Sequence, residues 1–318
     1  MWKKNDKLII AVSGGPDSIC LLDCLAHLQK KYAWGLHVAH VNYGLRERDA
    51  DADEQLVQEK AKLYNIPYSV LRAKKTHQKN NLEEHLRNIR YDFFEQLRYQ
   101  LGFDAIVTAH HRDDQAETIL LHLLRGCGMR GLGAMRPKND HIIRPFLLTS
   151  KSDILTYLQY KQLSFRLDAT NETSLFTRNR IRLEVIPLLQ KLNPNIVETL
   201  ARTALSLADD ADALSSHFKE KFTKKNTSTF LASIFNSLHP TDARAFLRTL
   251  IEETTSKKCI PTFNQLEELR KLIRSTKNKL SEKTLYDLKF TRKGDKVSVL
   301  VKIPSKNSKR RISRSFTV

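Results

Sequence analysis

The chain has 318 residues, of which 41% are hydrophobic and 28% are charged, a composition typical of a soluble globular protein with one large domain or two ordinary ones. Lysine and arginine outnumber aspartate and glutamate by 54 to 35, which gives a net charge of +19. A surplus of this size adds self-repulsion to the folded state and favours a polyanionic partner, although charge alone would also fit general solubility.

Cysteine usage and the N-terminus indicate a reducing compartment. The four cysteines (Cys20, Cys24, Cys127 and Cys259) form neither a C-x-x-C pair nor a Cys/His metal spacing. Cys20 and Cys24 stand four residues apart on an expected helix, which favours small core residues over a disulfide or a metal site. Residues 1–6 lack the apolar stretch of a signal peptide, and no run reaches membrane-spanning length. We therefore expect a cytoplasmic protein with no membrane partner.

Short apolar runs alternate with helical periods through the first half of the chain. Strands are predicted over residues 8–12, 34–41, 68–71 and 105–109, and the helices that follow them over 19–30, 50–64, 82–101 and 114–125. This alternation predicts an α/β fold with a doubly wound parallel sheet that helices cover on both faces. Ligands of such folds bind beyond the carboxyl ends of the strands.

The pattern changes after residue 125. A Gly- and Arg-rich loop is predicted over residues 126–137, and a helix is predicted to begin near the cap candidates Ser150 or Ser152. Residues 179–214 are typical of helix, with a break at Asn193–Pro194. Later elements are helices over 241–253 and 262–274 and a strand over 297–301.

We place a domain boundary inside the helical segment, near residue 205. The prediction is an α/β domain over 1–205 and a smaller, mostly helical α+β domain with a tail over 206–318. The last residues, 302–318, carry six lysines and arginines and no acid, so we expect them to form a mobile basic arm.

The first strand runs directly into a loop that suits phosphate binding. The loop consists of Ser13, Gly14, Gly15, Pro16, Asp17 and Ser18. The glycines permit a tight turn and close backbone approach, and the helix that follows directs free N–H groups at the same space. A carboxylate beside a phosphate requires a cation, so Asp17 predicts a Mg²⁺ ligand or a cationic partner. The alternative is a polar turn that only caps the helix.

A second polar run follows the fourth strand. Residues 108–118 read Thr-Ala-His-His-Arg-Asp-Asp-Gln-Ala-Glu-Thr, at the same edge of the predicted sheet as the phosphate loop. His110 is a candidate proton relay, and Asp114 is a candidate to hold Mg²⁺ or orient a base. Either Asp113 or Asp114 could instead cap the next helix, and we expect that one of them does.

No Walker A motif occurs in the chain, and Ser-Gly-Gly-x-Asp-Ser resembles the signature of the PP-loop ATP pyrophosphatases. The whole set of motifs is similar to that of the tRNA(Ile)-lysidine synthetases over about residues 7–190. Further matching segments are 41–46, 83–91, 125–132, 144–146, 168–171 and 178–182. Tyr43 stands where that family usually has histidine, so it receives no catalytic role. The length of the chain leaves no room for the second C-terminal domain of longer members.

The resemblance implies an ATP-dependent reaction. PP-loop enzymes cleave ATP between the α- and β-phosphates and activate a carbonyl oxygen as an adenylate. Residues 13–18 would bind the phosphates, with Asp17 near Mg²⁺. Arg182 would neutralise phosphate charge, with Arg90 as a second candidate. Arg182 also lies in a cluster with Arg178 and Arg180, so it could be an ordinary surface arginine.

The resemblance also implies the substrates. In this family the wobble cytidine of an isoleucine tRNA with a CAU anticodon is adenylated at its C2 oxygen, and the ε-amine of free lysine displaces AMP. His110 and Asp114 would flank the base, and residues 206–318 would recognise tRNA. Glu117 lies one helical turn after Asp114 and is a candidate to hold an ammonium group of lysine. A surface glutamate favoured by the helix dipole is the alternative.

Three other functions compete with this interpretation. A tRNA thiolase with an iron–sulfur cluster needs closely grouped cysteines, and the four cysteines here are wrongly spaced for one. An amidotransferase-type synthetase needs an ammonia source, for which this chain has no extra domain. A non-catalytic nucleic-acid-binding protein with a degenerate ATP site conflicts with the intact loop at residues 13–18.

Overall fold

The computed structural model describes residues 2–44, 47–73, 82–166, 177–222, 229–255, 261–275 and 280–301. The chain divides into two units, Met1–Ala208 and Asp209–Val318. The change from one unit to the other falls within helix α9 (Ile196–Phe222). Cys259, the 168–171 motif, the end of the 41–46 motif and the basic arm at 302–318 lie outside the described residues.

The first unit is built on a six-stranded sheet, which confirms the predicted α/β class. Its strands are β1 (Lys7–Ala11), β2 (Gly35–Asn42), β3 (Tyr68–Arg72), β4 (Ala105–Val107), β5 (Lys138–Asn139) and β6 (Ile142–Ile143). They are hydrogen-bonded in the order β3-β2-β1-β4-β6-β5. All pairings are parallel except that of β5 with β6.

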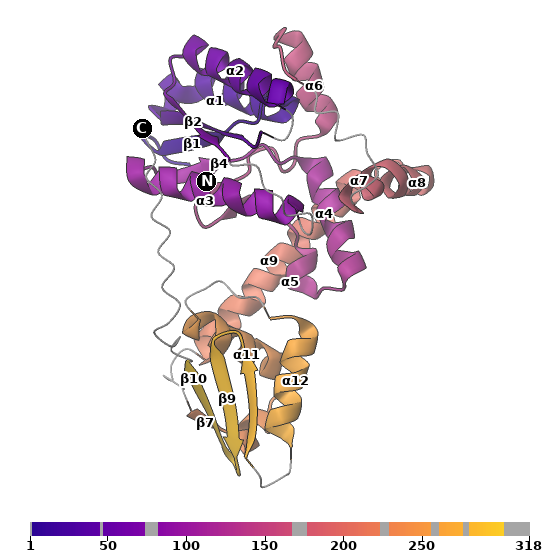
Figure 1. Cartoon of the computed structure of the whole chain (residues 1–318). Helices are drawn as coiled ribbons and strands as arrows, with labels where there is room; N and C mark the ends of the chain where they lie inside the picture. Colours follow the sequence, from indigo (N-terminus) through magenta and orange to yellow (C-terminus); the bar gives the residue numbers. More distant parts are fainter. Residues whose placement is uncertain are drawn as a thin grey trace. The chain divides into compact units, whose positions relative to one another are not determined.

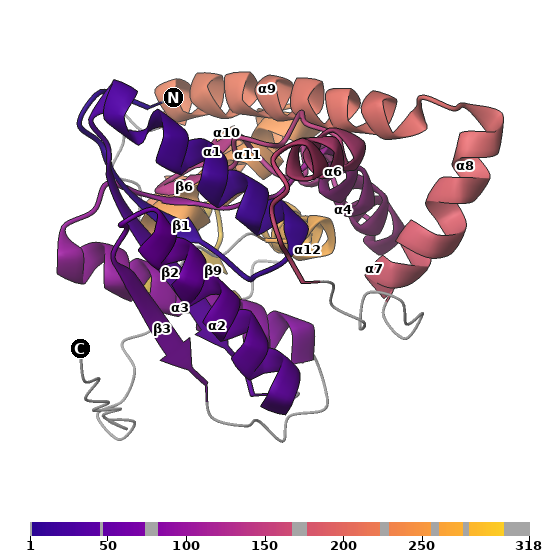
Figure 2. The same ribbon diagram turned by 90° about the horizontal axis from the view of Figure 1, so that it is seen from above.

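Helices cover both faces of this sheet, as the strand–helix alternation predicted. They include α1 (Pro16–Tyr32), α2 (Glu47–Leu63), α3 (Leu82–Leu101), α4 (Arg112–Arg125) and α6 (Lys151–Tyr160). Figures 1 and 2 show α1 and α2 on one side of the sheet and α3 on the other. Because side chains alternate along a strand, Leu8 and Ile10 of β1 enter the core under α1 and α2, whereas Ile9 packs with Phe94 of α3. Burial on both faces explains why β1 is continuously apolar.

The order of the strands sets the edge of the sheet at which ligands of such folds bind. The chain passes outward from β1 to β2 and β3 and then returns to place β4 on the opposite side of β1. Ile10 of β1 is directly paired with Val107 of β4. The loops that leave β1 and β4 therefore emerge side by side at a topological switch point of the sheet.

Helices complete the first unit beyond this sheet. The Gly- and Arg-rich loop after α4 contains the short helix α5 (Met129–Leu132). Helix α7 (Thr177–Arg180), the π-helical turn η2 (Ile181–Val185) and α8 (Ile186–Leu192) precede α9. The expected helix break lies at residues 193–195, between α8 and α9.

The second unit has its own sheet and core. Strands β7 (Thr229–Leu231), β8 (Ser281–Leu285), β9 (Leu288–Lys293) and β10 (Lys296–Val301) form an antiparallel sheet in the order β7-β10-β9-β8. Helices α10 (Ala232–Ser237), α11 (Pro240–Thr254) and α12 (Phe263–Arg274) share with it a core that includes Leu247, Leu266 and Phe290. This arrangement confirms the smaller α+β region, although the sequence predicted only one of its four strands. No described helix is long and apolar enough to cross a membrane.

The Gly- and Arg-rich loop is held against helices on either side. Buried Gln115 of α4 donates to the Met135 carbonyl at 2.8 Å and accepts from the Met135 N–H at 2.9 Å. A Cβ on Gly133 would lie 2.9 Å from the Cα of Ala208 in α9. A glycine is needed there because any side chain would meet backbone.

We predict that Gly133→Ala lowers the free energy of unfolding by about 1–3 kcal/mol, because the loop must move away from α9. Gly128→Ala is the matched control, since a Cβ on Gly128 has nothing within 4 Å. Chemical denaturation of both variants gives the comparison. Equal losses from the two substitutions would mean that the close approach to Ala208 does not stabilise the fold.

Candidate active site

The loop from Ser13 to Ser18 has the conformation of an anion-binding turn. Gly14 adopts φ = 92°, which side chains other than hydrogen rarely permit. The Ser13 N–H donates to Ser18 Oγ at 3.1 Å, and Ser18 Oγ donates to the Gly15 carbonyl at 2.9 Å. No side chain caps α1, whose N-cap is Gly15. The alternative of a turn that merely caps the helix is therefore wrong, and the N–H groups of the first turn stay available for an anion.

Arg166, which follows α6 in the chain, holds this loop in place. The backbone N–H of Arg166 donates to the Gly14 carbonyl at 3.1 Å. The Arg166 side chain bonds the carboxylates of Asp53 at 2.6 Å and Asp49 at 2.9 Å, both on α2. The loop thus has a defined backbone before any ligand binds. Nothing in the sequence pattern indicated the role of Arg166.

Asp17 points at a cationic partner. Its Oδ1 lies 2.6 Å from Nζ of Lys151, the first residue of α6, and its Oδ2 lies 3.7 Å from Nε2 of His111. Of the two sequence-based alternatives for Asp17, the structure contains the cationic partner. Within the described ranges, no three or more His, Cys, Asp and Glu residues cluster so as to hold a metal ion.

The two adjacent histidines occupy contrasting surroundings. His111 is buried at the start of α4, with carboxylate oxygens of Asp113 and Asp114 both 3.4 Å from its ring nitrogens. Burial by itself lowers the pKa of His111, but the surrounding carboxylates outweigh it and raise the pKa. His110 is half-buried, and its Nδ1 is 2.9 Å from Thr108 Oγ1.

His110 is held in its neutral form. Burial lowers its pKa to about 3; nearby Asp114 opposes the shift, whereas three arginines, Arg144, Arg90 and Arg87, add to it. At pH 7 the neutral imidazole of His110 can accept a hydrogen bond at one ring nitrogen, whereas an imidazolium could only donate. The structure therefore adds His111 to the polar groups around Asp17 and leaves His110 as the neutral member of the pair.

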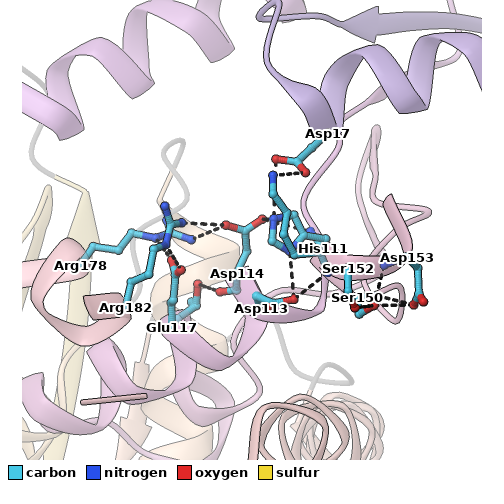
Figure 3. A network of polar contacts seen from close by, with 12 residues as sticks. Asp17, His111, Asp113, Asp114, Glu117, Ser150, Ser152, Asp153, Arg178 and Arg182 are labelled. Atoms are coloured by element: carbon cyan, nitrogen blue, oxygen red, sulfur yellow. Dashed lines mark hydrogen bonds and ion pairs between the residues drawn. The ribbon is translucent and has the colours of Figure 1, made fainter. Parts of the chain in front are cut away.

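Asp113 and Asp114 both accept hydrogen bonds at the start of a helix, whereas the sequence predicted this for only one of them. Asp114 Oδ2 accepts the His111 backbone N–H at 3.0 Å at the start of α4. Asp113 Oδ2 accepts the Lys151 backbone N–H at 3.0 Å at the start of α6. These bonds join the ends of the two helices and so hold Lys151, whose Nζ lies 2.6 Å from Asp17 Oδ1. Figure 3 shows Asp17, Asp113 and Asp114 around His111.

Glu117 ties α4 to α7 and η2. Its side chain is 1% exposed, so the surface-glutamate alternative is wrong. Its two oxygens accept from Arg178 Nε at 2.7 Å and from Arg182 Nε at 2.5 Å (Figure 3). Arg178 Nη2 also donates to Asp114 Oδ1 at 3.2 Å. Arg182 is thus a partner of a buried acid rather than an isolated surface arginine, and its side chain stays 37% exposed.

Two other candidates lie apart from this network. The guanidinium of Arg90 lies 5.6 Å from the centre of the Tyr91 ring, on α3. The Tyr43 hydroxyl donates to the Leu86 carbonyl at 3.2 Å, and burial raises its pKa. Tyr43 therefore stays protonated and binds α3, which agrees with assigning it no catalytic role.

This geometry places a phosphate-type loop, a neutral histidine and a set of arginines around one switch point. The sequence pattern of the PP-loop domain matches residues 2–189 of the chain. The chain belongs to the PP-loop family. The loop at residues 13–18 lies within this domain, and we refer to it below as the PP-loop.

Curated relatives confirm the narrower resemblance. The chain is 39% identical over 227 residues to a tRNA(Ile)-lysidine synthase of Caldanaerobacter subterraneus, a match that covers 70% of this chain and 49% of the relative. A tRNA(Ile)-lysidine synthase of Clostridium perfringens is 39% identical over 230 residues, with the same coverage. A bifunctional protein TilS/HprT of Listeria monocytogenes is 33% identical over 290 residues, 86% of this chain and 44% of that one. The chain spans about half the length of the curated relatives it matches.

A solved structure supports the fold independently of close sequence similarity. The U34-tRNA thiolase NcsA of Methanococcus maripaludis superimposes with a TM-score of 0.55 at 18% identity, covering 65% of this chain and 73% of the thiolase. At this level of identity the likeness concerns the fold.

We predict that Glu117→Gln lowers the free energy of unfolding by about 3 kcal/mol, because two arginines lose the buried carboxylate that pairs with them. Glu198→Gln is the control: Glu198 is largely exposed and lies 3.9 Å from Arg112, so its loss should cost less than about 1 kcal/mol. Urea denaturation measures both. If Glu117→Gln were as mild as the control, the Glu117 pairs would not stabilise the junction of α4 with α7.

Proposed function

We propose that this protein joins lysine to C2 of the wobble cytidine in an isoleucine tRNA with a CAU anticodon, at the expense of ATP. The observation that carries the proposal is the joint position of the PP-loop and the His110–Glu117 segment at one switch point of the sheet. The names of the curated relatives, whose matches cover 70% of this chain, support the choice of tRNA and product.

In the first half-reaction the cytidine O2 attacks the α-phosphorus of ATP, and pyrophosphate leaves. The free N–H groups at the start of α1 and the hydroxyls of Ser13 and Ser18 would bind the phosphates. Asp17 would hold Mg²⁺, which usually takes one or two carboxylates together with phosphate oxygens, so a single carboxylate in the PP-loop fits. When bound, Mg²⁺ supplies positive charge that offsets the charge developing on the phosphates. Lys151 stands beside Asp17 and would add a second cation there.

In the second half-reaction the neutral ε-amine of lysine attacks C2, and AMP departs with the former O2 of the cytidine. The ε-ammonium must first lose a proton to solvent, and the neutral ring of His110 would accept a hydrogen bond from the resulting amine. Thr108 fixes the orientation of that ring through the contact with Nδ1. Adenylation makes the step possible because it converts a poor oxygen leaving group into AMP.

Glu117 and Asp114 serve in this scheme by positioning arginines. Both oxygens of Glu117 already accept from guanidinium groups, so we assign it to holding Arg178 and Arg182 rather than to binding lysine. Arg182 keeps an exposed portion and would neutralise phosphate charge as AMP forms. Asp114 would flank the base together with His110.

We assign residues 1–205 to adenylation and residues 206–318 to tRNA recognition, with the reaction in the cytoplasm. The net charge of +19 supports a polyanionic substrate. Free lysine, ATP and tRNA are the substrates of the proposal.

Asp17→Asn should reduce the release of AMP and pyrophosphate at least about 100-fold while tRNA affinity changes less than about threefold, since the lost charge acts on ATP. Asp104→Asn, which removes a charge at the opposite end of the strands and keeps an acceptor for the Lys7 N–H, is the control. Pyrophosphate release is measured with ATP, tRNA and lysine over a range of Mg²⁺ concentrations. Near wild-type turnover of Asp17→Asn at limiting Mg²⁺ would rule out the metal role.

A further inference from the structure

A buried arginine beside the candidate site carries a charge that no described carboxylate balances. Arg144 follows β6 and is 5% exposed. Its Nη1 donates to the Arg136 carbonyl at 2.9 Å, but its buried Nε has no hydrogen-bond partner. Among the residues that the structure describes, no Asp or Glu forms an ion pair with Arg144. Burial without a counter-ion is costly for a charged group and lowers the pKa of Arg144.

A second unsatisfied polar group lies next to this guanidinium. The Tyr91 hydroxyl of α3 lies within reach of the Arg144 guanidinium and raises its pKa, but the two groups do not form a hydrogen bond of full geometry, and the buried hydroxyl has no other partner. The Tyr91 ring also lies between two further cations, with the guanidinium carbons of Arg87 and Arg90 at 4.9 Å and 5.6 Å from its centre. Two buried groups without partners and two neighbouring cations form a site that suits an oxyanion.

The position of this site separates it from the phosphates of ATP. The strand order places β4 between β1, which leads into the PP-loop, and β6, which leads into Arg144. The Thr108 N–H donates to the Ile143 carbonyl at 3.0 Å, so Arg144 neighbours the start of the segment that carries His110. The anion site thus lies on the side of His110 away from the PP-loop.

We propose that Arg144 and the Tyr91 hydroxyl bind a backbone phosphate of the RNA, next to the nucleotide whose base is held at His110. This proposal rests on the proposed function in taking RNA as the substrate and in placing the target base at His110. An RNA strand carries a phosphate on each side of every base, so a base placed at His110 brings a second oxyanion beside it without any contribution from ATP. A guanidinium is the side chain that best matches phosphate geometry, and the bound phosphate would supply the charge that Arg144 lacks.

The test is a double-mutant cycle that combines protein variants with tRNAs in which one backbone phosphate has been made neutral. Full-length tRNA is assembled by ligation with one neutral methylphosphonate on the 5′ or the 3′ side of the target cytidine, and a third tRNA carries it in a stem far from the anticodon. With wild-type protein, one of the two anticodon substitutions should raise the Kd about tenfold or more, the size expected for a hydrogen-bonded charged pair. Arg144→Met should raise the Kd for natural tRNA similarly, and the two changes together should cost no more than either alone.

Arg202→Met is the charge-matched control, because Arg202 is exposed on α9; its effect should multiply with that of each methylphosphonate. Tyr91→Phe deletes one hydroxyl and otherwise keeps the shape of the side chain. It replaces Arg144→Met in the cycle if that variant does not fold. Multiplicative effects of Arg144→Met, or of Tyr91→Phe in its place, with both anticodon substitutions would overturn the proposal. So would a raised KM for ATP or for lysine with unchanged tRNA affinity, which would assign the site to the nucleotide or to the lysine carboxylate. The cycle measures the Kd for tRNA and not the reaction. A protein that binds tRNA without forming lysidine would disprove the proposed function, and the cycle would still test whether Arg144 binds a phosphate.

Discussion

The parallel pairing of β1 with both β2 and β4 is the constraint on which the site depends. Since β4 returns to the side of β1 that β2 leaves free, the turn after β1 and the polar run after β4 must emerge at the same point. Continuous burial of Leu8, Ile9 and Ile10 fixes β1 in the centre of the sheet. The PP-loop thus follows a strand whose centre is fully buried, and helices α1 and α4 both begin beside it.

Opposed charges organise the residues around that point. Asp17 faces Lys151, and Glu117 holds two arginines, so each acidic group of the site already has a cationic partner. The same environment separates two neighbouring histidines: carboxylates raise the pKa of His111, whereas burial and arginines lower that of His110. The two adjacent histidines thereby differ in protonation at the same pH. In acid–base sites such a difference allows one group to act as the acid and the other as the base. A neutral His110 beside several guanidinium groups suits a reaction in which anionic substrates arrive and a neutral amine needs a hydrogen-bond acceptor.

The sequence predicted the elements that follow strong local rules. The four predicted runs correspond to β1 to β4, and the apolar character of β1 and β4 reflects their burial. Of the two cap candidates Ser150 and Ser152, Ser150 caps α6. The two-residue strands β5 and β6 are too short for any periodicity, and β8 and β9 are rich in charged residues because one face of their sheet is exposed. The PP-loop was evident because a single contiguous motif contains it.

Partners that meet only through tertiary structure were not predictable. Lys151 is 134 residues from Asp17, and no local pattern distinguishes it from other lysines. His111 and His110 are equivalent in sequence, and only the burial around each ring separates them. Glu117 was predicted to hold lysine or to lie at the surface, because its two arginine partners come 61 and 65 residues later in the chain. Arg144 lay in a matching motif, but its missing counter-ion is visible only when burial is known.

The central claim is that the PP-loop and the His110 segment form one site that attaches lysine to a cytidine. Mass spectrometry of the wobble nucleoside, after incubation of the protein with ATP, isotopically labelled lysine and an unmodified isoleucine tRNA carrying CAU, tests it most directly. The account predicts a cytidine that has lost one oxygen and gained labelled lysine through nitrogen, dependent on ATP and absent from a tRNA with a different wobble base. An unmodified cytidine, or a nucleoside that gains sulfur rather than lysine, would contradict it.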